Sequence, residues 1–258
     1  MTIYSYLTGT AGSGKSTLGS FFVNWFRENT DEVSIISVNL DPGVKWLPYA
    51  PDVDCRDYIN IDEIMTKYNL GPNGGLIASM DMLCTRIDEV KKEIEEFRPD
   101  HVVIDTPGQI ELFAFRSSGN LFVSALDPEK SVLIYLMDPS ICRTPSGFIS
   151  TLLLGANIQY RFLIPQIQVL SKIDLLPDEE FQKFLSWSQD PFKLEESLNK
   201  SSKGLKREMS IKLFQTLSEL GTMHQLIPVS GINGEGIEEL YAEISRVLSG
   251  GEDFFEIY

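Results

Sequence analysis

The feature that most limits how this chain can fold is the segment Gly9-Thr-Ala-Gly-Ser-Gly-Lys15-Ser16-Thr17. An apolar run precedes it, and a helical pattern begins at Lys15. The glycines allow the backbone to curl so that successive N–H groups point inward, and the start of the following helix adds a positive field. Such a strand–loop–helix unit binds phosphate groups, with the lysine reaching the β- and γ-phosphates and the serine hydroxyl available to Mg²⁺. We therefore expect nucleotide phosphates to contact Gly12, Ser13, Gly14, Lys15, Ser16 and Thr17.

The rest of the chain alternates short apolar runs with helical patterns, which predicts an α/β fold. Several runs are continuously apolar, as in parallel strands that are covered on both faces. The predicted strands are Ile3–Leu7, Val33–Leu40, His101–Asp105, Val132–Asp138, Ile164–Ser171 and Gln225–Val229. The predicted helices are Lys15–Asn29, Ala78–Phe97, Thr144–Tyr160 and Gly236–Leu248. With the phosphate-binding loop, this pattern predicts a three-layer P-loop NTPase with a mainly parallel central sheet.

Two segments interrupt the alternation. Residues 41–75 are rich in proline and glycine, and connections of this length in compact domains tend to be functional or disordered. Residues 177–221 are dense in charge and have helical spacing, but they also contain Trp187 and Phe192. We interpret this second segment as a helical insertion at the side of the sheet. The sequence therefore predicts one domain over residues 1–258, with insertions at about 42–80 and about 177–221.

Charge and cysteine content exclude several classes of function. The chain has 22 Lys and Arg against 37 Asp and Glu, a net charge of -15. This argues against non-specific binding to nucleic acid or anionic lipid, because both require a basic face. Cys55, Cys84 and Cys142 lie far apart without metal-ligand spacing, which is typical of reduced intracellular thiols. No signal peptide or long apolar segment is evident, so we expect a cytoplasmic protein that contacts neither membrane nor nucleic acid directly.

The segment Asp105-Thr-Pro-Gly-Gln109 directly follows a predicted strand. A carboxylate at that strand end, beside the first strand, can orient a Mg²⁺-bound water. The Gly108 N–H could bond a γ-phosphate, and losing this bond on hydrolysis would release the loop. Gln109 is suited to orienting the attacking water. The same residues are common in ordinary turns, but their place beside the phosphate-binding loop favours the functional interpretation.

A second carboxylate stands at another predicted strand end, in Asn39-Leu-Asp41-Pro42. Asp41 could bind a Mg²⁺ water or help to activate the nucleophile. An aspartate before proline is also a common turn or helix-cap residue. The spacing alone leaves both interpretations open.

The segment Ser171-Lys-Ile-Asp174 follows another predicted strand and bears on which base is bound. Guanine offers N1–H and N2–H₂ donors, which the Asp174 carboxylate can accept together. Adenine lacks both donors, so it would leave a desolvated carboxylate unpaired. The stem of Lys172 can lie across the flat base. Further on, backbone N–H groups of Ser230 and Gly231 could meet the guanine O6.

One further tripeptide, Gly71-Pro72-Asn73, lies between the second predicted strand and Asp105. Together with the motifs above, it makes the chain resemble the GPN-loop GTPases over nearly its whole length. A Gly-Pro-Asn tripeptide alone is only a turn sequence, so its placement among the other motifs carries the match. The resemblance rests on Gly9–Thr17, Asn39–Pro42, Gly71–Asn73, Asp105–Glu111, Ser171–Asp174 and Val229–Gly231. The chain is compact and is most similar to the short archaeal members.

The resemblance implies a homodimer that rearranges with the bound nucleotide. The Gly-Pro-Asn loop of one subunit would reach the phosphate site of its partner, where Asn73 would provide a neutral side chain near the γ-phosphate. Asp41, Gln109 and Glu111 would surround the attacking water. Other GTPases often use an arginine at this point, but none of Arg56, Arg86 and Arg116 has a motif context that supports such a role.

We therefore expect a slow, Mg²⁺-dependent GTPase that acts as a dimeric switch or assembly factor, with the metal at Ser16, Asp41 and Asp105. Two alternatives stay open: an ATP-dependent P-loop enzyme, and a nucleotide-held dimeric scaffold with incidental turnover. A protein client could bind the helical insertion or the aromatic C-terminal tail, residues 250–258.

Overall fold

The computed structural model describes residues 2–30, 33–201, 203–220 and 226–249, and within them the strands form one seven-stranded sheet. All neighbouring strands run parallel, in the order β3-β2-β4-β1-β5-β6-β7. The strands are β1 Ile3–Gly9, β2 Ile35–Asn39, β3 Val53–Asp54, β4 His101–Asp105, β5 Ser131–Met137, β6 Gln166–Leu170 and β7 Ile227–Pro228. The predicted parallel α/β fold is confirmed, and β3 is the one described strand that the sequence pattern did not indicate.

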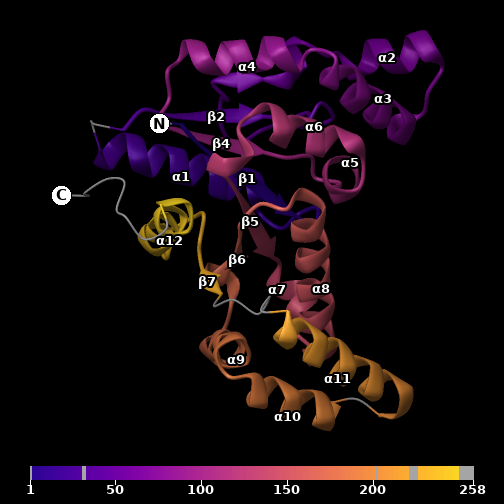
Figure 1. Cartoon of the computed structure of the whole chain (residues 1–258), viewed down its shortest axis with the longest axis vertical. Helices are drawn as coiled ribbons and strands as arrows, with labels where there is room; N and C mark the ends of the chain where they lie inside the picture. Colours follow the sequence, from indigo (N-terminus) through magenta and orange to yellow (C-terminus); the bar gives the residue numbers. More distant parts are fainter. Residues whose placement is uncertain (1, 31–32, 202, 221–225, 250–258) are drawn as a thin grey trace.

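Helices cover both faces of the sheet, as Figure 1 shows. Helices α1 and α12 pack on one face, and α3 to α6 with α8 pack on the other. The first helices are α1 Lys15–Asn29, α2 Ile61–Tyr68, α3 Pro72–Cys84, α4 Ile87–Glu96, α5 Ile110–Ala114 and α6 Ser117–Ala125. The others are α7 Pro139–Cys142, α8 Pro145–Phe162, α9 Asp178–Gln189, α10 Pro191–Ser201, α11 Gly204–Glu219 and α12 Ile237–Ser249. Short 3-10 turns are η1 Cys55–Asp57, η2 Pro128–Lys130 and η3 Ile173–Leu175.

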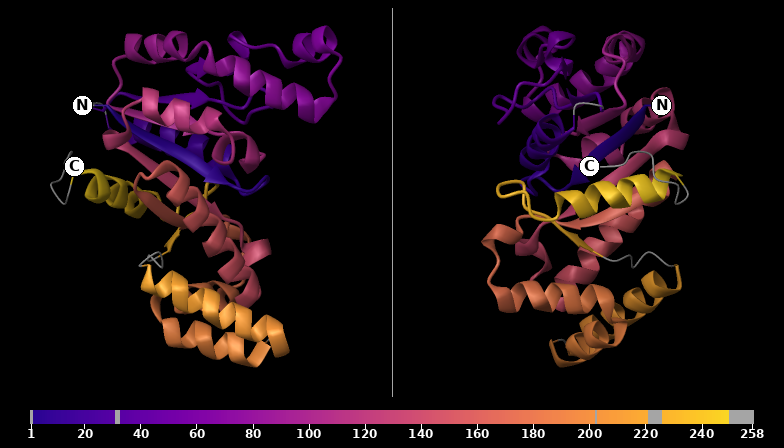
Figure 2. Two further views of the ribbon diagram at one scale, coloured as in Figure 1. Left: turned by 45° about the vertical axis from the view of Figure 1, so that its right-hand side comes forward. Right: turned by 90° about the vertical axis from the view of Figure 1, so that its left-hand side faces the viewer.

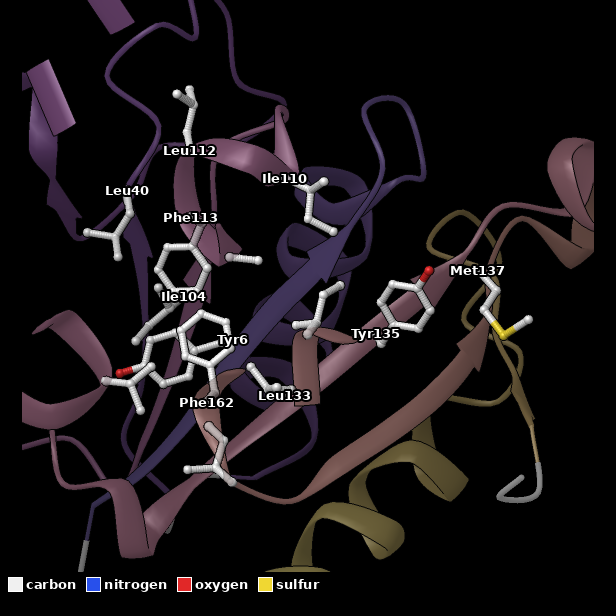
Figure 3. Close-up of a cluster of buried hydrophobic side chains, with 14 of the residues drawn as sticks. Tyr6, Leu40, Ile104, Ile110, Leu112, Phe113, Leu133, Tyr135, Met137 and Phe162 are labelled. Atoms are coloured by element: carbon white, nitrogen blue, oxygen red, sulfur yellow. The ribbon is translucent and has the colours of Figure 1, made fainter. Parts of the chain in front are cut away.

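The central strand β1 is buried along its whole length because helices cover both of its faces. Its side chains alternate between two apolar clusters: Tyr4 and Tyr6 belong to one, and Ile3 and Leu7 to the other. Figure 3 shows Tyr6 beside Phe113 of α5, with ring centroids 5.9 Å apart. This packing holds α5 against the sheet close to the carboxyl end of β1.

The predicted helix Ala78–Phe97 is wrong in one respect, because the chain forms two helices there, α3 and α4. The Thr85 hydroxyl donates to the Met82 carbonyl at 2.7 Å, and the Thr85 N–H bonds the same carbonyl. Such local side-chain bonds compete with helix continuation. Helix α4 then begins with Asp88 and Glu89, whose charges favour a helix N-terminus.

The proline- and glycine-rich segment 41–75 is more ordered than a long loop. It contains β3, η1, α2 and the start of α3. Helix α2 begins where Asn60 accepts hydrogen bonds from the N–H groups of Asp62 and Glu63. Pro72 occupies the first turn of α3, where its missing N–H costs nothing. The Gly-Pro-Asn tripeptide is therefore the N-terminus of a helix rather than an isolated turn.

The helical insertion consists of α9, α10 and α11, which lie at the opposite end of the sheet from α2, α3 and α4 (Figure 2). Trp187 is buried at its centre, with its ring 5.5 Å from that of Phe148 in α8 and 5.9 Å from that of Phe184. Leu194 and Leu198 complete this cluster. The insertion therefore has an apolar core that is continuous with the main one. None of the described helices is long and apolar enough to cross a membrane.

Candidate functional site

The candidate motifs gather at one edge of the sheet because each follows the carboxyl end of a parallel strand. Pairing aligns Leu7 of β1 with Asp105 of β4, and Asn39 of β2 with the same Asp105. On the other side of β1, Gly9 is aligned with Leu136 of β5. In open α/β sheets this edge is where ligands bind, near a point where the strand order reverses. The fold thus brings together segments that are far apart in the sequence.

The loop between β1 and α1 wraps around the Lys15 side chain. The buried ammonium donates to the carbonyls of Gly9 and Thr10, each at 3.0 Å. Burial lowers the pKa of Lys15, whereas the charges of Asp105 and Asp41 oppose this shift. Gly9 has no room for a side chain, because a Cβ there would lie 2.7 Å from the Leu136 carbonyl oxygen. The loop is therefore closely fitted to β5 and positions the lysine.

The start of α1 offers donors to an anion. Gly14 occupies its N-cap in the left-handed conformation, with a φ of 94°, and provides no capping side chain. The first turn contains no acidic residue. Beside it, the hydroxyl of Ser13 is buried without a hydrogen-bond partner among the described residues. N–H groups left free by this cap and the helix dipole suit a phosphate group.

Asp105 occupies the carboxyl end of β4, and its Oδ1 is buried without a hydrogen-bond partner within the described ranges. Burial raises the pKa of Asp105 to about 6, although the nearby Ser16 hydroxyl, the charge of Lys15 and the hydrogen bond from Tyr49 oppose the shift. A buried carboxylate oxygen near a serine hydroxyl matches the oxygen ligands that Mg²⁺ prefers. Among the described residues no cluster of three His, Cys, Asp or Glu forms a metal cage.

Tyr49 is a site residue that the sequence patterns missed. Its hydroxyl donates to Asp105 Oδ2 at 3.3 Å. Burial raises the pKa of Tyr49, and the neighbouring Asp105 charge raises it further, so the phenol stays a donor. Tyr49 lies in the irregular part of the segment after Asp41 and belongs to no motif, so no sequence signal pointed to it.

Asp41 is held by a set of backbone hydrogen bonds. Its N–H donates to Asn39 Oδ1 at 3.0 Å, and its Oδ1 accepts from the Gly43 N–H at 2.9 Å. Its Oδ2 accepts from the Gly108 N–H at 3.1 Å. Asp41 thus joins the loop after β2 to the loop after β4. The N–H of Gly108 that we assigned to a γ-phosphate is paired with this carboxylate in the structure.

Gln109 and Glu111 lie at the exposed start of α5, directly after Gly108. Asn73 is exposed in the first turn of α3, and none of the described contacts joins it to the phosphate-binding loop. One turn further along α3, Leu76 packs closely against Gly43, the residue whose N–H binds Asp41. The structure therefore links the Gly-Pro-Asn helix to the candidate site through the Asp41 loop.

A cavity of about 270 Å³ lies beside the phosphate-binding loop, between Gly14, Thr17, Lys172, Asp174 and Gly231. Asp174 is exposed at this cavity, and its Oδ1 accepts a hydrogen bond from the buried Ser230 hydroxyl at 2.7 Å. The backbone of Gly231 approaches α1 so closely that a Cβ would lie 3.0 Å from the N and Cα of Leu18. The segments Ser171–Asp174 and Val229–Gly231 therefore meet around one pocket.

Lys172 has a positive φ of 55°. This backbone conformation is strained for a residue other than glycine, so the surrounding structure must hold it in place. Its ammonium pairs with Asp138 Oδ2 at 2.8 Å. Asp138 is the last residue of the predicted strand Val132–Asp138, and no role was predicted for it. Asp138 directly follows β5, Asp105 is the last residue of β4, and Asp41 lies two residues beyond β2; this shared place at the carboxyl end of a strand was the available signal.

The three candidate arginines are all paired in the structure. Arg56 pairs with Asp54, Arg116 with Asp81 at 2.9 Å, and Arg86 with Glu89 at 3.4 Å.

A groove of about 760 Å³ runs between α8 and α11 and bears on the client hypothesis. Tyr160, Leu163 and Leu220 line it and are exposed. A client at the insertion stays a prediction, and the C-terminal tail at 250–258 lies outside the described residues.

Comparison with known proteins adds independent information. A protein-family model described as "Conserved hypothetical ATP binding protein" matches residues 7–250. The chain is 34% identical to a GPN-loop GTPase of Pyrococcus abyssi over 90% of its own length and 92% of that relative. It is 32% identical to GPN-loop GTPase 1 of Dictyostelium discoideum over 97% of its length, and spans 62% of that longer relative.

A solved structure gives the same answer for the fold. The crystal structure of a GTPase in apo form from Pyrococcus abyssi superposes with a TM-score of 0.85 and is 31% identical in sequence. The match covers 95% of this chain and 97% of that structure.

Proposed function

The chain belongs to the GPN-loop GTPase family, and from this premise we propose that it binds GTP and GDP and hydrolyses GTP to GDP and phosphate. The observation that carries the proposal is the cavity beside the phosphate-binding loop. There, Ser230 orients the Asp174 carboxylate at 2.7 Å and the stem of Lys172 forms a wall. A carboxylate held in this way accepts the two donors of guanine, which adenine lacks.

The phosphates would lie on the loop from Gly12 to Thr17. Lys15 is already held in the loop by two carbonyl oxygens, so it needs little reordering to reach the β- and γ-phosphates. The uncapped start of α1 and the unpaired Ser13 hydroxyl provide further donors among the described residues. Phosphoryl transfer depends mainly on such positioning and on electrostatic stabilisation.

Mg²⁺ would be held by Ser16, with Asp105 and Asp41 orienting its waters. The buried, unpaired Oδ1 of Asp105 within the described residues supports this assignment. When bound, the metal would neutralise charge that develops on the β- and γ-phosphate oxygens. Tyr49 would hold Asp105 in position through its second oxygen.

Gln109, Glu111 and Asp41 would orient the attacking water. Asp41 lies on the loop after β2, and Gln109 and Glu111 lie at the start of α5, which directly follows Gly108; the Asp41–Gly108 hydrogen bond joins these two segments. Because Gly108 and Gln109 are adjacent, a change in the partner of the Gly108 N–H would move the side chain of Gln109 relative to the phosphates. This coupling supports a role as a nucleotide-driven switch or assembly factor.

We propose a homodimer in which Asn73 acts across the interface. Asn73 is exposed at the start of α3, where it is accessible to a second subunit. The contact between Leu76 and Gly43 would carry a displacement of that helix to Asp41. The sequence of the chain and its family membership support this role.

The proposal is tested by measuring phosphate release from GTP with wild-type protein, Lys15→Ala and Gln109→Ala in Mg²⁺. We expect Lys15→Ala to abolish turnover and Gln109→Ala to reduce the hydrolysis rate at least about tenfold while changing the affinity for GDP by less than about twofold. Equal losses of rate and affinity for Gln109→Ala would contradict the water-positioning role. Wild-type turnover no faster than that of Lys15→Ala would favour the alternative of a nucleotide-held scaffold.

An ATP-dependent P-loop enzyme is the second candidate, and the description of the matching family model favours it. On that alternative, Lys172 and Asp174 would be structural residues. Faster phosphate release from ATP than from GTP in the same assay would support it.

A further inference from the structure

We propose that Asp138 is a positioning residue for base recognition: its carboxylate fixes Lys172 so that the lysine stem forms a wall of the base cavity. The inference rests on the proposed function, because it concerns the same cavity. Asp138 itself would not touch the base. It would act through the lysine.

The first observation is that Lys172 has contacts on two sides. On one side its ammonium pairs with Asp138 Oδ2 at 2.8 Å. On the other, its Cγ and Cε lie 3.8 and 3.7 Å from the place where a Cβ of Gly14 would be. The stem therefore runs along the phosphate-binding loop, between the loop and the carboxylate. A flexible four-carbon side chain is thus restrained at its end as well as at its backbone.

The second observation is that Asp138 is itself fixed. Its side chain is 10% exposed, and its Oδ1 accepts a hydrogen bond from the Ser140 N–H at 2.8 Å at the start of α7. Burial opposes ionisation of Asp138, but the hydrogen bonds from Lys172 and Ser140 outweigh it and hold its pKa below the ordinary value. Asp138 is therefore a charged anchor whose position is set by β5 and α7.

The third observation concerns charge at the cavity. The Lys172 ammonium is paired to Asp138, and within the described ranges the Asp174 carboxylate forms no ion pair with a lysine. If the ammonium were free, it could pair with Asp174 and occupy the acceptors that guanine requires. Asp138 would thus have two effects. It would hold the Lys172 stem along the plane of the base, and it would leave the Asp174 oxygens available to accept the guanine donors.

The test uses Asp138→Asn, which removes the charge but keeps an oxygen to accept the Ser140 N–H. We would measure the dissociation constants of GDP and of pyrophosphate, which has no base, by calorimetry. We expect Asp138→Asn to weaken GDP binding at least about tenfold and to change pyrophosphate binding by less than about twofold. Lys172→Met keeps the stem and removes the ammonium, so we expect the same pattern. In the double variant the GDP loss should not exceed that of the larger single loss, because both substitutions break one interaction.

The matched control is Asp52→Asn, which also removes the charge of an aspartate in an ion pair. Asp52 Oδ2 lies 2.7 Å from Arg27 Nη2, and this pair is not part of the cavity. The substitution should leave the affinities for GDP and pyrophosphate unchanged. Equal weakening of GDP and pyrophosphate by Asp138→Asn, or additive GDP losses in the double variant, would overturn the inference. If wild-type protein bound pyrophosphate but did not prefer GDP to ADP, the proposed guanine site itself would have failed.

Discussion

The buried His101 shows how a single residue connects this sequence to its stability. Its ring is buried on β4, where Nε2 lies 2.8 Å from the Ser5 hydroxyl of β1. Phe22 and Phe26 of α1 make edge contacts with it, at 5.7 and 6.1 Å between ring centroids. Burial lowers the pKa of His101 from 6.5 to about 3. The folded protein therefore requires the neutral imidazole.

This environment predicts a pH-dependent loss of stability. Because the pKa is lower in the folded state, the contribution of His101 is present above pH 6.5 and is lost as the pH falls toward about 3. At pH 5 the lost stability amounts to about 2 kcal/mol. We expect His101→Gln, which keeps a polar atom near Ser5, to flatten the dependence of unfolding free energy on pH between 6.5 and 5. Parallel urea-denaturation profiles for the two proteins across that range would contradict this account.

At the scale of elements, the insertion is stabilised by one aromatic cluster. Trp187 is 2% exposed and donates its indole N–H to the Ser197 hydroxyl at 3.0 Å, which ties α9 to α10. Contacts with Phe148 tie the same helices to α8. The neighbouring Phe192 is 81% exposed and lies outside this cluster. Two aromatic residues of one insertion therefore have opposite environments.

We expect Trp187→Ala to cost about 3–5 kcal/mol, because it leaves a large cavity at the centre of the buried cluster. Amide hydrogen exchange should rise in α9, α10 and α11 and change little in β1 and α1. The control Phe192→Ala should change stability by less than about 0.5 kcal/mol, as for other exposed positions. Similar effects of the two substitutions would show that the buried cluster is not what stabilises the insertion.

The elements also show how far the sequence could predict the structure. The strands that lie under both helical layers are continuously apolar, so β1 and β4 were predicted within two residues at each end. Strand β3 has only Val53 and Asp54, too short for any period to be visible. The break between α3 and α4 depends on a hydroxyl of Thr85 that bonds the preceding turn, which apolar spacing does not report.

The candidate site likewise contains residues that the sequence could predict and residues that it could not. Residues in motifs, such as Lys15, Asp105 and Asp174, could be assigned because their spacing has a chemical meaning. Tyr49 belongs to no motif and Asp138 offered only its place at a strand end, because the contact that each makes is with a residue more than thirty positions away. Such contacts are created by the order of strands in the sheet, which the sequence pattern alone does not give.

At the scale of the whole molecule, the sheet holds the candidate site at one edge between two helical regions, α2 to α4 and α9 to α11 (Figure 2). The net charge of -15 means that the surface as a whole does not attract an anion, so nucleotide affinity must come from the local donors of the phosphate-binding loop. On the proposed function, base selectivity would come from Asp174 and its neighbours, because the phosphate groups are common to all nucleotides.

The most direct test of the account is a calorimetric titration of the purified protein with GDP and with ADP in Mg²⁺, with Asp174→Asn alongside. The account predicts that GDP binds at least about a hundredfold more tightly than ADP, because adenine leaves the Asp174 carboxylate unpaired. It also predicts that Asp174→Asn shifts the preference from GDP to xanthosine diphosphate. Equal affinities of the wild-type protein for GDP and ADP would contradict the assignment of a guanine site, although the phosphate-binding loop would stand.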